Sequence, residues 1–197
     1  MASWDDSYAG TTPPPWDIGK PQPAFARLAS QGLLTGRLLD AGCGTGEHTL
    51  LAAASGADAL GVDGSALAIE RARGKAAQRG SKARFEVADA LRLADLGLTF
   101  EVVIDSGLFH VFDDTSRARY VASLASVLRP GGRLYLMCFS DAQPGTAGPR
   151  RVSEEELRAA FASGWEIAAI RADTFEINPG PFPGTTVQAW LATIGRV

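Results

Sequence analysis

The chain has 197 residues, of which 21% are charged, and its formal net charge is only −3. This length can bury one good core but leaves little for a second domain, so we expect a single domain over residues 1–197. The weak acidic balance argues against a broad basic face for nucleic acid, and no apolar run is long enough to span a bilayer.

Residues 1–30 are predicted to form an arm or lid outside the main fold. Residues 11–23 are rich in proline, which favours a stiff, extended path over a helix. A stiff segment that carries a tryptophan, here Trp16, is suited to lie across a pocket. The alternatives are a proline arm strapped onto the core and a segment that binds a partner.

The first strand is predicted directly before a glycine-dense turn. The run Leu-Leu-Asp-Ala over residues 38–41 leads into glycines at alternate positions, Gly42, Gly44 and Gly46, and then into a helix. Alternate glycines let the backbone turn sharply and let a ligand approach main-chain N–H groups that a Cβ would shield. This junction therefore indicates a nucleotide-like cofactor with a carboxylate or phosphate end.

The residues around this turn narrow the choice of cofactor. A nicotinamide fingerprint passes from an apolar strand directly into Gly-x-Gly-x-x-Gly. Here Asp40 comes first, and Glu47 stands in place of the third glycine. In addition, no tyrosine of the chain has a lysine four residues later, as a short-chain dehydrogenase would require. A NAD(P)-dependent oxidoreductase is therefore the weaker alternative.

Three further strand-like runs each end at an acid: Asp63, Asp89 and Asp105. Ligands of doubly wound sheets bind beyond the carboxyl ends of the strands. An acid at the end of the second strand can accept hydrogen bonds from both ribose hydroxyls of a nucleoside. Taken alone, Asp63 could instead cap the helix that begins near Ser65, and Asp89 could be an ordinary turn acid.

The remaining elements complete an α/β pattern. Strand-like runs alternate with Ala-rich helical runs over residues 37–139, which predicts a doubly wound, mostly parallel sheet with helices on both faces. Ser153, followed by three glutamates, is expected to begin a helix. The last two strands are predicted over residues 165–172 and 187–194.

Two groups of residues are not expected to form a site. Cys43 lies in the glycine turn and Cys138 in an apolar strand, which gives neither a disulfide framework nor metal-ligand spacing. We therefore expect no metal and a reducing, cytoplasmic location. A basic cluster is expected to form a solvated helix face: Arg71, Arg73, Lys75 and Arg79.

The order of these motifs resembles that of the class I S-adenosylmethionine-dependent methyltransferases, over most of the chain. Asp40 and the alternate glycines look like the first motif of that family, and Asp89-Ala90 resembles the pair that its members place against the adenine. Arg129-Pro-Gly-Gly132 resembles the turn that leads into the family's fifth strand. The resemblance implies a Rossmann-like, seven-stranded sheet whose last strand pair is antiparallel, with S-adenosylmethionine as cofactor and S-adenosylhomocysteine as product.

The resemblance also implies a role for each cofactor-binding residue. The acid and glycines of the first motif would hold the methionine end, Asp63 the ribose, and Asp89 with Ala90 the adenine. The predicted set is Trp16, Asp40, Gly42, Gly44, Gly46, Asp63, Gly64, Asp89, Ala90 and Asp105.

The N-terminal arm adds a second resemblance. Pro-Trp-Asp-x-Gly over residues 15–19, followed closely by proline, resembles the cofactor lid of the thiol, thiopurine and halide methyltransferases. In that group the tryptophan that Trp16 matches packs near the methionine part of the cofactor. The resemblance points to a small-molecule acceptor and away from protein or DNA methylation.

His110 is the candidate catalytic residue. It lies a few residues past Asp105, where members of the family place loop residues that face the acceptor. An imidazole there could accept a proton near neutral pH and act as a general base. A phenol or hydroquinone would gain from such a base, whereas a thiolate or heterocyclic nitrogen would need none. The alternative is a hydrogen-bonded core histidine. Several aromatic residues could form acceptor walls or plain core: Trp4, Tyr8, Phe109, Phe112 and Phe182.

The sequence thus predicts an enzyme that methylates a thiol, a phenol or hydroquinone, or a heterocycle by in-line displacement. We expect a monomer or homodimer with no nucleic-acid or membrane partner. Besides the oxidoreductase, a regulatory domain that binds S-adenosylmethionine without catalysis stays open, because binding needs the same glycines and acids.

Overall fold

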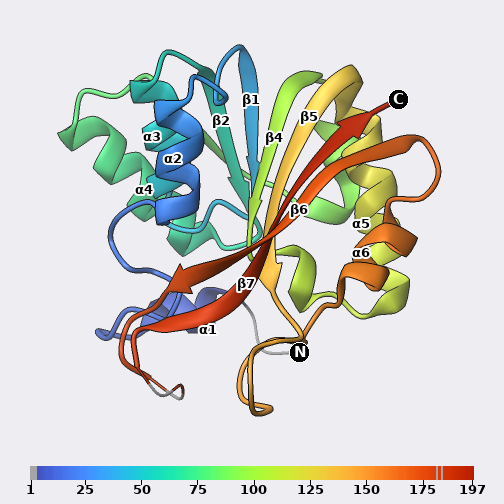
Figure 1. The fold of residues 1–197 in the computed structure, drawn as a ribbon. Helices are drawn as coiled ribbons and strands as arrows, with labels where there is room; N and C mark the ends of the chain where they lie inside the picture. Colours follow the sequence, from blue (N-terminus) through green and yellow to red (C-terminus); the bar gives the residue numbers. More distant parts are fainter. Residues whose placement is uncertain (1–3, 181, 183) are drawn as a thin grey trace.

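The computed structural model describes residues 4–180, 182 and 184–197, and these form a seven-stranded sheet with helices packed around it (Figure 1). The strands are β1 (Arg37–Ala41), β2 (Asp58–Asp63), β3 (Arg84–Val87), β4 (Phe100–Ser106), β5 (Leu128–Phe139), β6 (Trp165–Glu176) and β7 (Thr186–Arg196). Their order is β3-β2-β1-β4-β5-β7-β6. Strands β1 to β5 pair in parallel, and β7 runs antiparallel to both β5 and β6. The predicted Rossmann-like fold is confirmed.

Helices cover both faces of the sheet. The helices of the structure are α1 (Trp4–Ala9), α2 (Pro23–Ser30), α3 (Glu47–Ala54), α4 (Ala66–Gln78), α5 (Asp114–Val127) and α6 (Glu154–Ala160), with short 3-10 helices η1 (Ala90–Leu96) and η2 (Phe109–Val111). No helix in the described ranges is long and apolar enough to cross a membrane.

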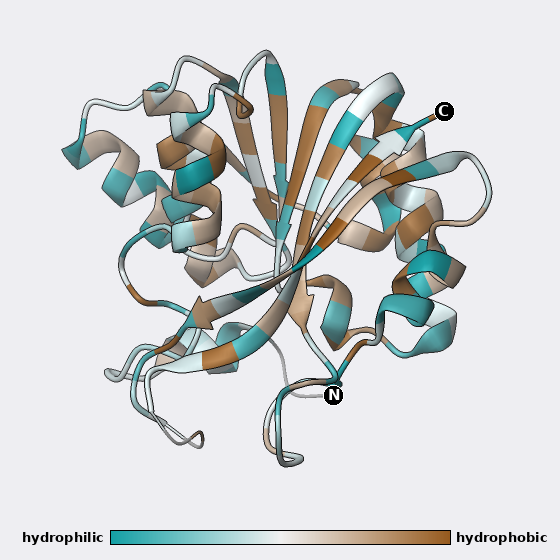
Figure 2. Ribbon diagram, viewed as in Figure 1, coloured by the Kyte–Doolittle hydropathy of each residue, from teal (hydrophilic) through white to brown (hydrophobic). Residues whose placement is uncertain are grey.

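The central strands are buried on both faces. Leu38 packs into one apolar cluster with Phe25 of α2, whereas its neighbour Leu39 packs into another with Tyr120 of α5. Figure 2 shows hydrophobic residues concentrated along these strands. Near-continuous apolar runs are typical of parallel strands covered on both sides, and they explain why β1 and β4 were readily predicted from the sequence.

Local signals set the helix boundaries. Ser153 and Glu156 form a capping box at the start of α6, which confirms the predicted helix start. The Ser65 hydroxyl accepts the Ala68 N–H (3.1 Å) at the start of α4.

One segment differs from the sequence-based expectation. The predicted turn at residues 129–132 belongs to β5, where the register with β4 shifts between Phe100 and Val102. At the other end of the chain, residues 4–9 form helix α1, ahead of the proline-rich residues that were predicted to be extended. This helix packs on α4, where the Arg71 guanidinium donates to the Tyr8 carbonyl (2.5 Å).

Candidate functional site

A cavity of about 690 Å³ opens at the carboxyl ends of the parallel strands. Its walls come from the glycine turn after β1, the ends of β2 and β3, the loop after β4, the N-terminal arm and the end of β6. This is the place where doubly wound sheets bind their ligands, and the volume lies in the range of small-molecule sites.

The glycine turn forms one wall of the cavity. The Gly42 and Cys43 N–H groups both donate to the Val62 carbonyl (2.9 Å each), which holds the turn against β2. Gly44 and Gly46 have φ values of +51° and +88°, in the left-handed region that favours glycine. A Cβ on Gly44 would lie 3.0 Å from the Tyr8 hydroxyl. The chain therefore needs glycines here to keep the backbone close to its neighbours.

Asp63 connects the end of β2 with the glycine turn. Its Oδ2 accepts the Gly44 N–H and its Oδ1 accepts the Ser65 N–H, both at 2.8 Å. Burial raises the pKa of this carboxyl, while the two backbone hydrogen bonds lower it. Asp63 thus holds the backbone at the start of α4, and it also lines the cavity with lone pairs left to accept from a ligand.

Asp89 lies farther along the same wall. Its Oδ1 accepts the Leu91 N–H (2.9 Å), so it caps η1 as an ordinary turn acid would. The residue is exposed, and together with Gly64 and Ala90 it lines the cavity. Its carboxylate has further lone pairs that could accept hydrogen bonds from a ligand.

Asp40 and Asp105 take a different place from the predicted one. Both are fully buried and neither lines the cavity. Thr49 donates to Asp40 Oδ2 (2.7 Å), whereas Asp40 Oδ1 has no partner in the described structure. Asp105 accepts the Leu108 and Phe109 N–H groups (2.7 and 3.0 Å) and the Tyr120 hydroxyl (2.9 Å). Asp40 thus contacts α3 through Thr49, and Asp105 holds the loop after β4.

The two buried acids lead to a prediction for stability against pH. Burial raises the pKa of Asp40 and of Asp105 from 3.8 to about 7. The folded state then binds more protons than the unfolded state between pH 4 and 7, so each acid lowers the free energy of unfolding as the pH rises through this window. Burial lowers the pKa of His48 to about 4 and of His110 to about 3. The unfolded state therefore binds more protons at these histidines, and each of them raises the free energy of unfolding as the pH rises toward 6.5.

The contribution of Asp40 is therefore isolated by comparison with a variant. We expect Asp40→Asn to gain stability relative to the unmodified protein as the pH rises from 5 to 8, measured by urea unfolding. A difference in unfolding free energy that stays constant over this range would contradict the raised pKa.

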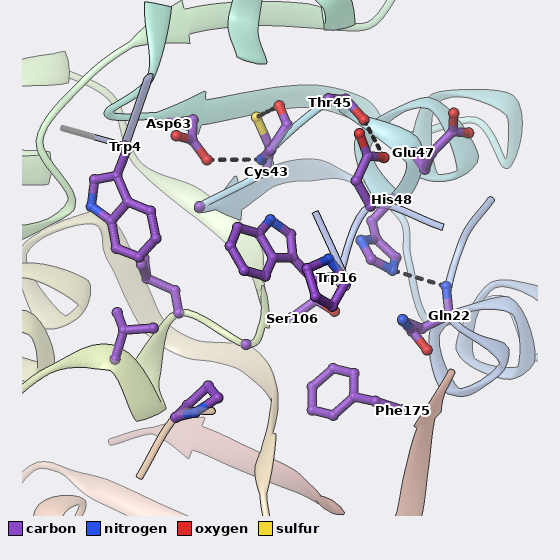
Figure 3. Close-up of a pocket in the computed structure, with 18 of the residues that line it drawn as sticks. Trp4, Trp16, Gln22, Cys43, Thr45, Glu47, His48, Asp63, Ser106 and Phe175 are labelled. Carbon is purple, nitrogen blue, oxygen red and sulfur yellow. Dashed lines mark hydrogen bonds between the residues drawn. The ribbon is translucent and has the colours of Figure 1, made fainter. Parts of the chain in front are cut away.

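The N-terminal arm lies along the open side of the cavity. Trp4 and Trp16 meet edge to face, with ring centroids 6.5 Å apart, on the side where Asp63 and Cys43 lie (Figure 3). The Trp16 indole N–H donates to the Tyr8 hydroxyl (3.0 Å), yet Trp16 remains 49% exposed. Half-exposed tryptophans at a cavity mouth offer apolar surface that a ligand can cover.

Hydrogen bonds fix this arm on two sides. The Thr45 hydroxyl of the glycine turn donates to Asp17 Oδ1 (2.8 Å). On the other side, the Asn178 side-chain amide donates to the Pro14 and Asp17 carbonyls (3.1 and 2.7 Å). The arm thus joins the glycine turn to the segment that follows β6.

Sequence reasoning missed His48 and Gln22, which lie where the arm meets α3. His48 Nε2 accepts the Gln22 N–H (3.0 Å, Figure 3), and the Gln22 side chain exchanges two hydrogen bonds with the Glu176 backbone (2.8 Å each). Both residues line the cavity. The available signal was a histidine two positions after the last glycine of the turn.

The basic cluster faces solvent as predicted, because Arg71, Arg73 and Arg79 are exposed, and its members also make specific contacts. Lys75 and Arg79 both form ion pairs with Glu47 (2.9 and 2.8 Å), whose side chain is 8% exposed. Arg73 donates to the Phe85 carbonyl (2.7 Å). Glu47, which replaces the third glycine of a nicotinamide motif, thereby joins α3 to α4.

Aromatic side chains dominate the end of the cavity near β5 and β6. His110 packs edge to face against Phe139 and Phe175, with ring centroids 4.8 and 6.1 Å apart, and Phe182 packs against Phe139. All four line the cavity. Phe112 does so as well, whereas Phe109 is fully buried against Phe161 and belongs to the core.

Comparison with known proteins supports the methyltransferase class that the sequence motifs resemble. Residues 38–132 match a family model described as a methyltransferase domain. The chain is 37% identical to a 2-heptyl-1-hydroxyquinolin-4(1H)-one methyltransferase of Mycobacteroides abscessus, over 85% of this chain and 78% of the relative. It is 29% identical to a probable thiol methyltransferase 2 of Arabidopsis thaliana, over 89% of this chain and 79% of the relative.

Solved structures agree with the fold. A structure from work on the conversion of a disulfide bond into a thioacetal group during echinomycin biosynthesis superposes with a TM-score of 0.88 and 39% identity, covering 98% of this chain and 91% of that one. Magnesium protoporphyrin IX methyltransferase from Synechocystis, solved with S-adenosylhomocysteine, shares the fold at 24% identity, with a TM-score of 0.68 over 88% of this chain and 80% of the other.

The fold and the cavity define a Rossmann-like α/β protein with a ligand site at the carboxyl ends of its parallel strands. The chain belongs to the class I S-adenosylmethionine-dependent methyltransferases. Nothing in these comparisons supports the oxidoreductase or the non-catalytic regulator.

Proposed function

We propose that this methyltransferase modifies a heteroatom of a flat, mostly apolar acceptor. The observation that carries the proposal is the contrast between the two ends of the cavity, with glycines and Asp63 at one end and Phe139, Phe175 and Phe182 at the other. The names of the relatives, one a hydroxyquinolone methyltransferase and one a probable thiol methyltransferase, support an aromatic or soft nucleophile. A cytoplasmic location, a monomeric or homodimeric state and the lack of a nucleic-acid or membrane partner stay predictions.

We propose that the glycine-turn end holds the cofactor. The backbone of this turn forms a cradle that a Cβ on Gly44 would narrow, and Asp40 Oδ1 beneath it is a buried acceptor without a partner. Both features fit a ligand with an ammonium and a carboxylate end. Asp63 and Gly64 would bind the ribose, and Asp89 and Ala90 would contact the adenine. Asp105 would act indirectly, by holding the loop after β4.

S-adenosylmethionine supplies a methyl group on a positively charged sulfur, and this charge activates the carbon for in-line displacement. The protein then needs to hold the acceptor in line with that carbon and to exclude water. The phenylalanines near His110 provide a dry wall for a planar ring. The heteroatom of the acceptor would face the glycine-turn end, where the methyl group would lie.

We also propose that residues 1–30 serve as a lid over the cofactor within a single domain of residues 1–197. The half-exposed Trp16 and the hydrogen bonds of residues 14–17 to Thr45 and Asn178 support this role. A tryptophan packed over the methionine part would exclude water from the reacting methyl group.

Calorimetric titration tests the cofactor before any acceptor is known. We expect micromolar binding of S-adenosylhomocysteine and no binding of NADH. Turnover of S-adenosylmethionine is then measured with 1-hydroxyquinolin-4(1H)-one and with benzenethiol. Binding without turnover of either acceptor would argue against the proposed acceptor class, and binding of NADH alone would overturn the cofactor.

Asp63→Ala is expected to weaken the binding of S-adenosylhomocysteine by up to about 100-fold, because charge-assisted hydrogen bonds to the ribose are lost. Asp58→Ala is the matched control, since Asp58 lies at the opposite end of the same strand and pairs with Arg84 (2.8 Å). Calorimetric titration of both variants with S-adenosylhomocysteine measures the two affinities. Equal affinity in the Asp63 variant and the unmodified protein would mean that Asp63 does not bind the ribose.

A further inference from the structure

The His110 ring is held in a single orientation. Its Nδ1 accepts the Phe139 N–H (2.8 Å), and its faces and edges pack against Phe139 and Phe175. The loop that carries it is fixed from below, because Asp105 accepts the N–H groups of Leu108 and Phe109. The residue as a whole is 5% exposed. A ring held in this way has little freedom to turn during a reaction.

The hydrogen bond to the backbone also determines the tautomer. A backbone N–H is always a donor, so Nδ1 must present a lone pair, and the proton of the neutral ring lies on Nε2. Within the described ranges, Nε2 has no hydrogen-bond partner and is not a fully enclosed atom, while His110 lines the cavity. A Cβ on Gly107 would lie 3.5 Å from Nε2, so the glycine leaves that nitrogen open. His110 thus presents an N–H group to the end of the cavity that Phe139, Phe175 and Phe182 line, which we call the aromatic end.

This arrangement does not suit a general base. The only lone pair of the ring is already used by the Phe139 N–H, and a second proton would have to displace that hydrogen bond. Burial, and then the charges of Arg151 and Arg117, lower the pKa of His110 to about 3. Glu176, which also lines the cavity, is paired with Lys20 (2.5 Å). Among the described residues, this end therefore contains a neutral donor, and its carboxylate is already paired.

We propose that His110 is a fixed Nε2–H donor that selects acceptors carrying a second oxygen, of carbonyl type and conjugated with the heteroatom that is methylated. The inference rests on the proposed function and deepens it by naming the substrate class. A hydrogen bond to the attacking atom itself would engage the lone pair that must form the new bond. A bond to the conjugated oxygen positions the ring and leaves that lone pair free.

The chemistry balances without a base in the site. The acceptor releases its proton to solvent before it binds. A lone pair of its heteroatom then forms the bond to the methyl carbon while the carbon–sulfur bond breaks and its electron pair stays on sulfur. The negative charge of the acceptor and the positive charge of the sulfonium cancel. His110 keeps its proton throughout.

Two substitutions separate the loss of the Nε2–H donor from a loss of structure. In His110→Asn, the side-chain oxygen can still accept the Phe139 N–H, but no donor reaches the position of Nε2. In His110→Gln, the amide N–H reaches that position. With 1-hydroxyquinolin-4(1H)-one, which has a conjugated carbonyl, we expect KM to rise about 10- to 100-fold for Asn and only a few-fold for Gln. With benzenethiol, which lacks a second heteroatom, KM should change less than about three-fold in both, since no hydrogen bond is lost.

Each result supports or overturns the role of His110. Equal losses on both acceptors would make His110 a structural residue and overturn its role as a donor. A loss of kcat with the hydroxyquinolone in both variants, together with the loss of one limb of the pH profile, would make His110 a base. Binding of S-adenosylhomocysteine stays unchanged in both variants if only the acceptor is affected, whereas absent binding in the unmodified protein would mean that the proposed function itself fails. Nitrogen-15 NMR of the unmodified protein gives a readout independent of activity: we expect protonated Nε2 and bare Nδ1 from pH 5 to 8. A proton on Nδ1 would overturn the proposal, even if the Asn variant does not fold.

Discussion

Gly46→Ala is expected to abolish measurable binding of S-adenosylhomocysteine and to lower the free energy of unfolding by about 2–5 kcal/mol. Two effects add. Gly46 has a φ of +88°, which costs an alanine about 1–2 kcal/mol. Its Cβ would also lie 2.7 Å from the ring of Phe85 and 2.9 Å from the Ala72 Cβ, so the turn or α4 must move. Urea unfolding and calorimetry of the variant measure the two consequences.

The matched control is Gly56→Ala at the other end of α3. Gly56 has a φ of +95°, but nothing lies within 4 Å of its ideal Cβ. This variant therefore carries the backbone strain without the clash, and we expect it to lose about 1–2 kcal/mol while cofactor binding stays unchanged. Equal destabilisation in both variants would mean that contact with Phe85 and Ala72 does not limit the turn.

The fold was predictable because each level of the sequence points to the same answer. Apolar runs such as residues 38–39 and 102–104 are buried on both faces of the sheet, so they are recognisable without knowledge of their partners. Boundaries marked by local chemistry, such as the capping box at Ser153, were also correct. The early part of β5 was missed, because its Pro-Gly-Gly sequence is typical of a turn and the strand accommodates it with a shift in register.

The site was predictable in part, and the missed contacts share a physical cause. The bonds of Asn178 to Pro14 and of Gln22 to Glu176 join residues more than 150 positions apart, which no local pattern reports. His48 interacts through a backbone N–H of the arm, which is equally invisible in a sequence. The acids at the strand ends were found, but the sequence did not distinguish those that line the cavity from those that lie below it, such as Asp40.

Asp105→Ala is expected to lower the free energy of unfolding by about 3–5 kcal/mol and to reduce turnover strongly. The buried carboxylate accepts three hydrogen bonds, from the Leu108 and Phe109 N–H groups and from the Tyr120 hydroxyl. Alanine would leave these donors buried without partners, and each such group costs about 1–3 kcal/mol. Because Leu108 and Phe109 begin the turn that carries His110, the aromatic end should lose its geometry.

Tyr120→Phe is the control that separates the two roles of Asp105. It removes one of the three donors together with its need for an acceptor, and it leaves the loop bonds to Leu108 and Phe109 intact. We expect about 0.5–1.5 kcal/mol of destabilisation and nearly normal turnover. If Tyr120→Phe reduced turnover as much as Asp105→Ala, the carboxylate would serve the site through α5 rather than through the loop after β4. Turnover with 1-hydroxyquinolin-4(1H)-one, measured beside urea unfolding, distinguishes these outcomes, since only a disturbed loop moves the His110 donor away from the acceptor.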